Sequence, residues 1–78
     1  MSDRLVIVIP CYNEEKVLRV TAPLFLQELD IMIKEGRICK DSSILFVDDG
    51  SKDSTWEIIQ SLSGEDKRYT GIKLSRNR

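Results

Sequence analysis

Leu-Val-Ile-Val-Ile at residues 5–9 and Ile-Leu-Phe-Val at residues 44–47 are two short runs that are apolar at every position. Such runs are typical of parallel strands, because helices usually cover both faces of a parallel sheet. A weaker run, Gly-Ile-Lys-Leu at residues 71–74, alternates in polarity and predicts a strand covered mainly on one side. We therefore expect a three-stranded parallel sheet.

The segment between the first two strands predicts an amphipathic helix. An interior proline removes a backbone hydrogen bond, so we expect this helix to begin near Thr21 as its N-cap. Pro23 then lies in the first turn, and Gly36 ends the helix. Apolar residues recur at steps of three and four along this segment, as on one face of a helix: Leu18, Ala22, Phe25, Leu29 and Met32.

A second helix is predicted after the second strand. Ser54 and Glu57 have the spacing of a capping box at its start. Trp56 and Ile59 are expected to face the sheet, and Gly64 to end the helix. The elements alternate as strand, helix, strand, helix, strand with short connections. This order predicts an α/β fold with a Rossmann-like parallel sheet and right-handed crossovers.

Composition and charge restrict the class of protein. The chain has 78 residues, enough for one small domain or a piece of a larger one. Its 12 basic and 13 acidic residues give a net charge of -1, which argues against a nucleic-acid partner. The absence of histidine and the wide spacing of Cys11 and Cys39 argue against a zinc site. We expect reduced thiols and a cytoplasmic location, since neither a signal peptide nor a membrane span is visible.

Polar residues follow each predicted strand, at the sheet edge where open parallel sheets bind ligands. After the first strand, Tyr12 can stack on a base, and Asn13 or Glu14 can hydrogen-bond a base or ribose. The alternative is that Asn13 and Glu14 only begin the next helix.

The second strand is followed by a cluster of acidic and hydroxyl residues. A carboxylate of Asp48 or Asp49 can accept from the N–H groups of uracil or guanine, and Gly50 supplies the turn. Ser51 and Asp53 have an alternative role as caps of the following helix. A magnesium interpretation of the two adjacent aspartates is open, although neighbouring residues on a strand point to opposite faces.

The last four residues form a third polar cluster. Arg76 can present a guanidinium to a diphosphate. The alternative is that residues 75–78 form a solvated tail.

Three motifs in this order resemble family 2 glycosyltransferases. Val-Ile-Pro-Cys-Tyr-Asn-Glu-Glu at residues 8–15 resembles the opening motif, and Phe-Val-Asp-Asp-Gly-Ser at residues 46–51, followed by Asp53 and Thr55, resembles the second. Leu-Ser-Arg-Asn at residues 74–77 resembles the third-strand motif of the polyprenyl-phosphate branch, which includes dolichol-phosphate mannose synthases and bactoprenol glucosyltransferases. The resemblance covers essentially the whole chain.

This resemblance implies a GT-A fold in which residues 1–78 are the nucleotide-binding N-terminal portion, ending before the Asp-x-Asp motif. It implies inverting transfer of a hexose from a UDP- or GDP-sugar to an acceptor, polyprenyl phosphate, with Mg²⁺ or Mn²⁺. No residue is assigned as a catalytic base or metal ligand, so we expect the chain alone to be inactive. The candidate nucleotide-binding residues are Pro10, Tyr12, Asn13, Glu14, Asp48, Asp49, Ser51 and Arg76.

One position departs from the family pattern. Arg78 stands where an aromatic residue usually continues the third motif. The main alternative is a non-catalytic α/β module whose acidic rim binds a metal or a protein. A phospho-acceptor receiver domain fits poorly, because receivers place acids after the first strand.

We also expect self-association, since a three-stranded sheet exposes an apolar edge. The parent protein is expected in the cytoplasm or at the cytoplasmic face of the membrane.

Overall fold

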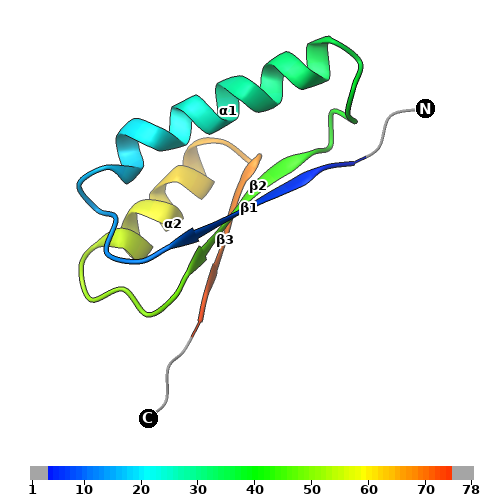
Figure 1. Cartoon of the computed structure of the whole chain (residues 1–78). Helices are drawn as coiled ribbons and strands as arrows, with labels where there is room; N and C mark the ends of the chain where they lie inside the picture. The colour runs from blue at the N-terminus through cyan, green and yellow to red at the C-terminus, as the bar shows by residue number, and fades with distance from the viewer. Residues whose placement is uncertain (1–3, 75–78) are drawn as a thin grey trace.

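The computed structural model describes residues 4–74. The elements follow in the predicted order: β1 (Val6–Cys11), α1 (Leu18–Lys34), β2 (Ser43–Asp48), α2 (Thr55–Glu65) and β3 (Tyr69–Lys73) (Figure 1). All three strands are parallel, in the sheet order β1-β2-β3. The predicted α/β, Rossmann-like βαβαβ fold is confirmed. Neither helix has the length and apolar character needed to cross a membrane.

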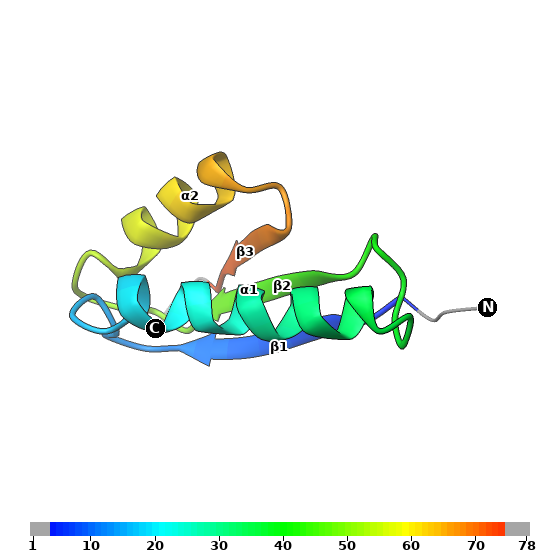
Figure 2. The same ribbon diagram turned by 90° about the horizontal axis from the view of Figure 1, so that it is seen from above.

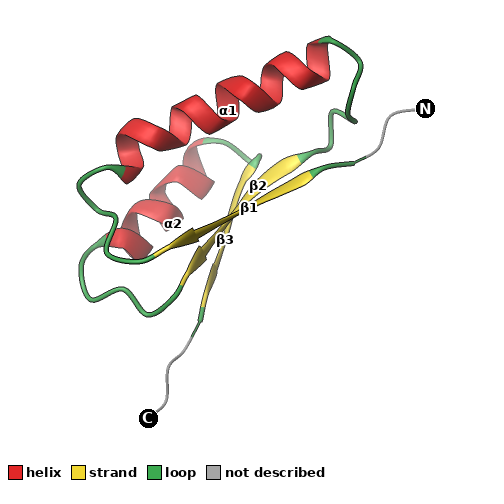
Figure 3. Cartoon of the chain, in the orientation of Figure 1, coloured by secondary structure: helices red, strands yellow, loops and turns green. Residues whose placement is uncertain are grey.

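Both helices lie on the same side of the sheet (Figure 3). The register pairs Ile9 with Phe46 and Phe46 with Gly71, so these three positions share one face. Seen from above, α1 lies along β1 and β2, and α2 lies beside β3 (Figure 2). Consecutive right-handed crossovers that step in one direction across a sheet place their helices on one face.

The expectation that helices cover both faces of the first two strands was wrong for residues 4–74. On the helix-free face, Val8 of β1 is 58% exposed, and Ile72 of β3 is 46% exposed. Leu45 and Val47 of β2 lie between them and are half-buried. An apolar strip therefore crosses the sheet on the face opposite the helices.

The core fills the space between the other face of the sheet and the helices. Phe46 at the centre of β2 is fully buried, and its ring centroid lies 5.8 Å from that of Tyr69. Gly71 of β3 gives α2 its close approach, because a Cβ there would overlap the side chain of Ile59. The buried apolar residues are Cys11, Leu18, Ala22, Leu29, Ile44, Phe46, Ile59, Leu62 and Tyr69.

α1 begins earlier than the sequence predicts. Its first residue is Leu18 and its N-cap is Val17, which makes no side-chain capping bond, so the prediction of Thr21 as N-cap was wrong. The loop before α1 already forms a helical turn, because the Leu18 N–H donates to the Glu14 carbonyl at 2.9 Å. The predicted end is confirmed, since Gly36 follows the helix with a φ of 73°.

Pro23 lies inside α1. It has no N–H to donate to the carbonyl of Arg19, one turn earlier. Both residues are exposed, so water can reach that carbonyl. The buried stripe of Leu18, Ala22 and Leu29 keeps its helical spacing, and burial of this stripe outweighs the lost hydrogen bond.

Two other boundaries and one capping motif differ from the prediction. Ser54 is the N-cap of α2 but makes no side-chain capping bond, so the predicted capping box with Glu57 is wrong. Gly64 lies inside α2, which continues to Glu65. β1 continues through Pro10 because it is an edge strand of this sheet, where a residue without an N–H is tolerated.

Candidate functional site

Tyr12 and Asp49 follow paired positions at the carboxyl ends of neighbouring strands. Cys11 of β1 pairs with Asp48 of β2, and the Asp49 N–H donates to the Cys11 carbonyl at 3.0 Å. Tyr12 is 53% exposed, and Asp49 is half-buried. The two candidate residues therefore lie on one rim of the sheet, as expected from parallel strands.

β3 ends at the same rim. The Leu74 N–H donates to the Asp48 carbonyl at 2.8 Å. Arg76, the remaining predicted nucleotide-binding residue, lies outside the described residues. Pro10 is on the helix-free face of β1 and is exposed.

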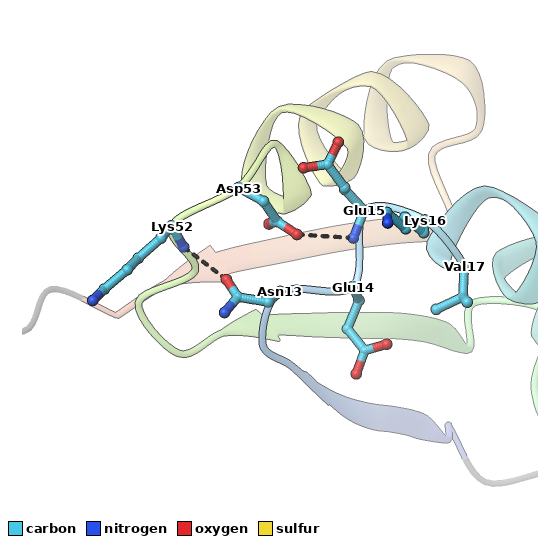
Figure 4. A pocket seen from close by; sticks show the side chains of 7 residues that line it. All are labelled: Asn13, Glu14, Glu15, Lys16, Val17, Lys52 and Asp53. Carbon is cyan, nitrogen blue, oxygen red and sulfur yellow. Dashed lines mark hydrogen bonds between the residues drawn. The ribbon is translucent and has the colours of Figure 1, made fainter.

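A cleft of about 570 Å³ opens beside this rim, between the β1–α1 loop (residues 12–17) and the β2–α2 loop (residues 49–54) (Figure 4). Of the predicted site residues, Asn13 and Glu14 line it. The side chains of Glu14 and Glu15 point in opposite directions from the loop (Figure 4). The full lining is Asn13, Glu14, Glu15, Lys16, Val17, Lys52 and Asp53.

Five hydrogen bonds join the β1–α1 loop to the β2–α2 loop and the first residue of α2; we call them the loop clasp. Asn13 makes two of them. Its N–H donates to the Ser51 hydroxyl at 2.9 Å, and its side-chain Oδ1 accepts from the Lys52 N–H at 2.8 Å. Asn13 has a φ of 52°, a left-handed conformation that asparagine tolerates better than most residues.

Thr55 forms the buried part of the clasp. Its hydroxyl accepts a 2.7 Å hydrogen bond from the Glu14 N–H and donates a short hydrogen bond to the Asp53 carboxylate. Thr55 is fully buried. Its hydroxyl is therefore satisfied both as donor and as acceptor.

Asp53 and Glu15 form the part of the loop clasp that lines the cleft. Asp53 Oδ2 accepts from the Glu15 N–H at 3.3 Å, and Glu15 Oε1 accepts from the Ser54 N–H at 3.2 Å. Asp53 Oδ1 also accepts from the Thr55 N–H at 3.0 Å, which is the predicted alternative role at the start of α2. Although burial alone would raise the pKa of the Asp53 carboxyl, hydrogen bonds from Thr55 and Glu15 hold it below its ordinary value.

Asp48 is fully buried on the helix side of the sheet. Its Oδ1 accepts from the Ser51 N–H at 3.1 Å, so it shapes the turn that carries Asp49 and Ser51. Its Oδ2 is buried without a hydrogen-bond partner among the described residues. Burial raises the pKa of the neighbouring Cys11 thiol to about 11, and the charges of Glu14 and Asp48 add to this effect. Cys11 and Cys39 are both free thiols.

The donor set for a metal ion is incomplete within residues 4–74. No three carboxylate, thiol or imidazole side chains in this part of the chain lie close enough to hold one ion. Asp48 and Asp49 supply two adjacent carboxylates, but Asp48 is turned into the interior. We assign no step to a metal at these residues.

The sequence patterns did not identify the residues that connect the two loops. Glu15, Lys52 and Thr55 contribute to the clasp, yet none was a predicted site residue. A signal was present, because short polar side chains in two loops at neighbouring strand ends tend to satisfy each other's backbone groups. Which group pairs with which depends on the loop conformations.

The sequence model of Glycosyl transferase family 2 matches residues 6–78. The chain is similar to the uncharacterized glycosyltransferase YkoT of Bacillus subtilis (strain 168), with 49% identity over 73 residues, which cover 94% of this chain and 22% of the relative. It is also similar to the uncharacterized glycosyltransferase YkcC of the same strain, with 41% identity over 71 residues, 91% of this chain and 20% of the relative.

A third relative has a more specific name. It is the undecaprenyl-phosphate 4-deoxy-4-formamido-L-arabinose transferase of Shewanella sediminis (strain HAW-EB3), 37% identical over 76 residues, 96% of this chain and 21% of the relative. The chain thus spans about a fifth of the length of the curated relatives it matches. No solved structure is significantly similar to it.

Proposed function

This chain belongs to glycosyl transferase family 2, and we propose that it binds the nucleotide part of a UDP- or GDP-sugar donor. The observation that supports the proposal is the shared rim, where Tyr12 and Asp49 follow paired residues of β1 and β2. An exposed aromatic ring and a carboxylate on one rim suit a nucleobase, because the ring can stack and the carboxylate can accept hydrogen bonds from the N–H groups of the base.

In this proposal, each predicted residue contributes through its position on the rim. Tyr12 stacks on the base, and Asp49 accepts from the base edge. Asn13 and Glu14, which line the cleft, face the ribose side. Pro10 borders the base pocket, and Arg76 contacts the phosphates. Asp48 and Ser51 hold the turn that presents Asp49, through the hydrogen bond from the Ser51 N–H to Asp48.

The proposed acceptor is a polyprenyl phosphate. The support is the third-strand motif at residues 74–77 together with the Shewanella sediminis relative, whose name specifies undecaprenyl phosphate. Transfer of a hexose with inversion is proposed for the full-length protein, at the cytoplasmic face of the membrane. Mg²⁺ or Mn²⁺ is proposed to bind there with residues beyond this chain, and we propose that residues 1–78 alone do not turn over substrate.

A titration of the chain with UDP and GDP tests this function. We expect binding of at least one nucleotide, observed by calorimetry or by NMR shifts. Asp49→Ala should weaken it by about tenfold or more, since a hydrogen bond to a charged group contributes about 1.5–3 kcal/mol. Asp41→Ala is the matched control, because Asp41 is exposed in a separate pocket at the amino end of β2.

A magnesium titration separates this function from the alternative module. An equal response to Mg²⁺ with and without nucleotide, in a folded sample that binds neither UDP nor GDP, would favour the acidic metal- or protein-binding rim. A response to nucleotide that Asp49→Ala removes would favour the donor site.

A further inference from the structure

We propose that Thr55 is a positioning residue of this site: its hydroxyl holds the backbone of the β1–α1 loop in the conformation that binds the nucleotide. This inference rests on the proposed function. The β1–α1 loop carries Tyr12 and Glu14, whereas Asp49 belongs to the β2–α2 loop. Thr55 connects these two loops through its hydrogen bond from the Glu14 N–H.

The start of the β1–α1 loop is held by side chains from a distant segment of the chain. Three successive N–H groups, those of Asn13, Glu14 and Glu15, all donate to side chains that lie about forty positions later, at separations of 38, 41 and 38 residues. Asn13 also adopts a φ of 52°. A loop whose N–H groups are satisfied by another segment depends on that segment for its shape.

Among these three acceptors, Thr55 is the one that is fully buried. Its hydrogen bond, at 2.7 Å, is also the shortest of the three. The other two acceptors, Ser51 and Asp53, are half-buried, so water can replace them. Water cannot readily replace a buried acceptor. Loss of the Thr55 hydroxyl therefore leaves the Glu14 N–H without its acceptor.

Asp53 orients the Thr55 hydroxyl. Its carboxylate accepts a hydrogen bond from the Thr55 hydroxyl, which leaves an oxygen lone pair of Thr55 directed at the Glu14 N–H. Asp53 also accepts from the Thr55 and Glu15 N–H groups. Asp53 and Thr55 thus hold the β1–α1 loop together. A site whose parts are held in place before binding loses less conformational entropy when the ligand binds.

The test compares Thr55→Val with Thr55→Ser in the complete chain. Valine has the shape of threonine without an acceptor, and serine restores the hydroxyl. Two readouts are measured on each variant: hydrogen exchange of the Glu14 amide relative to the β2 amides, and the Kd for UDP and GDP. Thr21→Val is the matched control, because the Thr21 hydroxyl donates within α1, to the Leu18 carbonyl.

We expect Thr55→Val to speed Glu14 exchange and to weaken nucleotide binding by about tenfold each, the size of one lost hydrogen bond. Thr55→Ser should recover both to within about threefold, and Thr21→Val should change neither. Faster Glu14 exchange with an unchanged Kd would overturn the positioning role and leave the proposed function intact. Absence of UDP and GDP binding in the folded wild type would instead overturn the proposed function, and the positioning role with it.

A second variant keeps the test decisive if Thr55→Val does not fold. Asp53→Ala removes the acceptor that orients the hydroxyl, at a half-buried position. We expect nucleotide binding several-fold weaker than in the wild type, with the β2 amides still protected. Wild-type affinity in Asp53→Ala would overturn the proposal.

Discussion

The Thr55 hydroxyl accepts a 2.7 Å hydrogen bond from the backbone N–H of Glu14, 41 residues earlier in the chain. This bond joins the two sequence motifs that follow β1 and β2. It explains how residues from both motifs keep a fixed relation on one rim, although neither loop has regular secondary structure.

Two glycines should respond to alanine in opposite directions. At Gly71, a Cβ would overlap Ile59, whose side chain is 1% exposed and tightly packed. We expect Gly71→Ala to lower the free energy of unfolding by about 1–3 kcal/mol. Gly64 lies inside α2 with open space around it, so Gly64→Ala should raise that free energy by about 0.5–1 kcal/mol. Urea unfolding measures both, and equal effects would contradict the packing described here.

Replacement of Pro23 by alanine should stabilise the protein. Pro23 interrupts the backbone hydrogen bonds of α1 at an exposed position, so alanine restores one bond without a steric cost. We expect the free energy of unfolding to rise by about 1–3 kcal/mol, less the entropy that proline removes from the unfolded chain. A lower urea midpoint for Pro23→Ala would show that α1 does not run continuously from Leu18.

The two thiols should differ in reactivity. Cys11 is 3% exposed and its pKa is raised to about 11, whereas Cys39 is half-buried. At pH 8, roughly one Cys11 thiol in a thousand is then ionised. We expect Ellman's reagent to modify Cys39 first, and Cys11 only as the protein unfolds. Cys39→Ser provides the control, since it should leave a single slow phase.

The same shift predicts a loss of stability at high pH. Burial raises the pKa of the Cys11 thiol from its ordinary value of 9.0 to about 11, so the unfolded state loses its proton first. The contribution to stability is therefore complete below about pH 9 and is lost as the pH rises towards 11. Urea midpoints measured over this range should fall less steeply for Cys11→Ala than for the wild type, and parallel curves would count against a buried thiol.

The helix-free face of the sheet should promote self-association. Val6, Val8, Ile72 and Leu74 are each more than 40% exposed there, and β1 and β3 are open edges. We expect light scattering to show association at high concentration and Val8→Lys to reduce it. Val20→Lys is the control, since Val20 is 67% exposed on α1. A monomeric wild type would contradict this prediction.

Local patterns in the sequence were sufficient for the order of elements. The apolar runs at residues 5–9 and 44–47 correspond to β1 and β2, and the stripe that includes Ala22 and Leu29 is the buried side of α1. Boundaries were less predictable. Pro23 indicated a later helix start, but burial of Leu18 and the turn at Glu14 extend the helix through it.

The sequence by itself determined the fold class and the rim, because alternation of strands and helices forces the carboxyl ends of parallel strands to one edge. Only the tertiary structure decided which groups meet there. It turned Asp48 inward, left Asp49 half-buried on the rim that also carries Tyr12, and paired Thr55 with Glu14. Hydrogen bonds between distant loops depend on backbone angles such as the φ of 52° at Asn13, which no local pattern specifies.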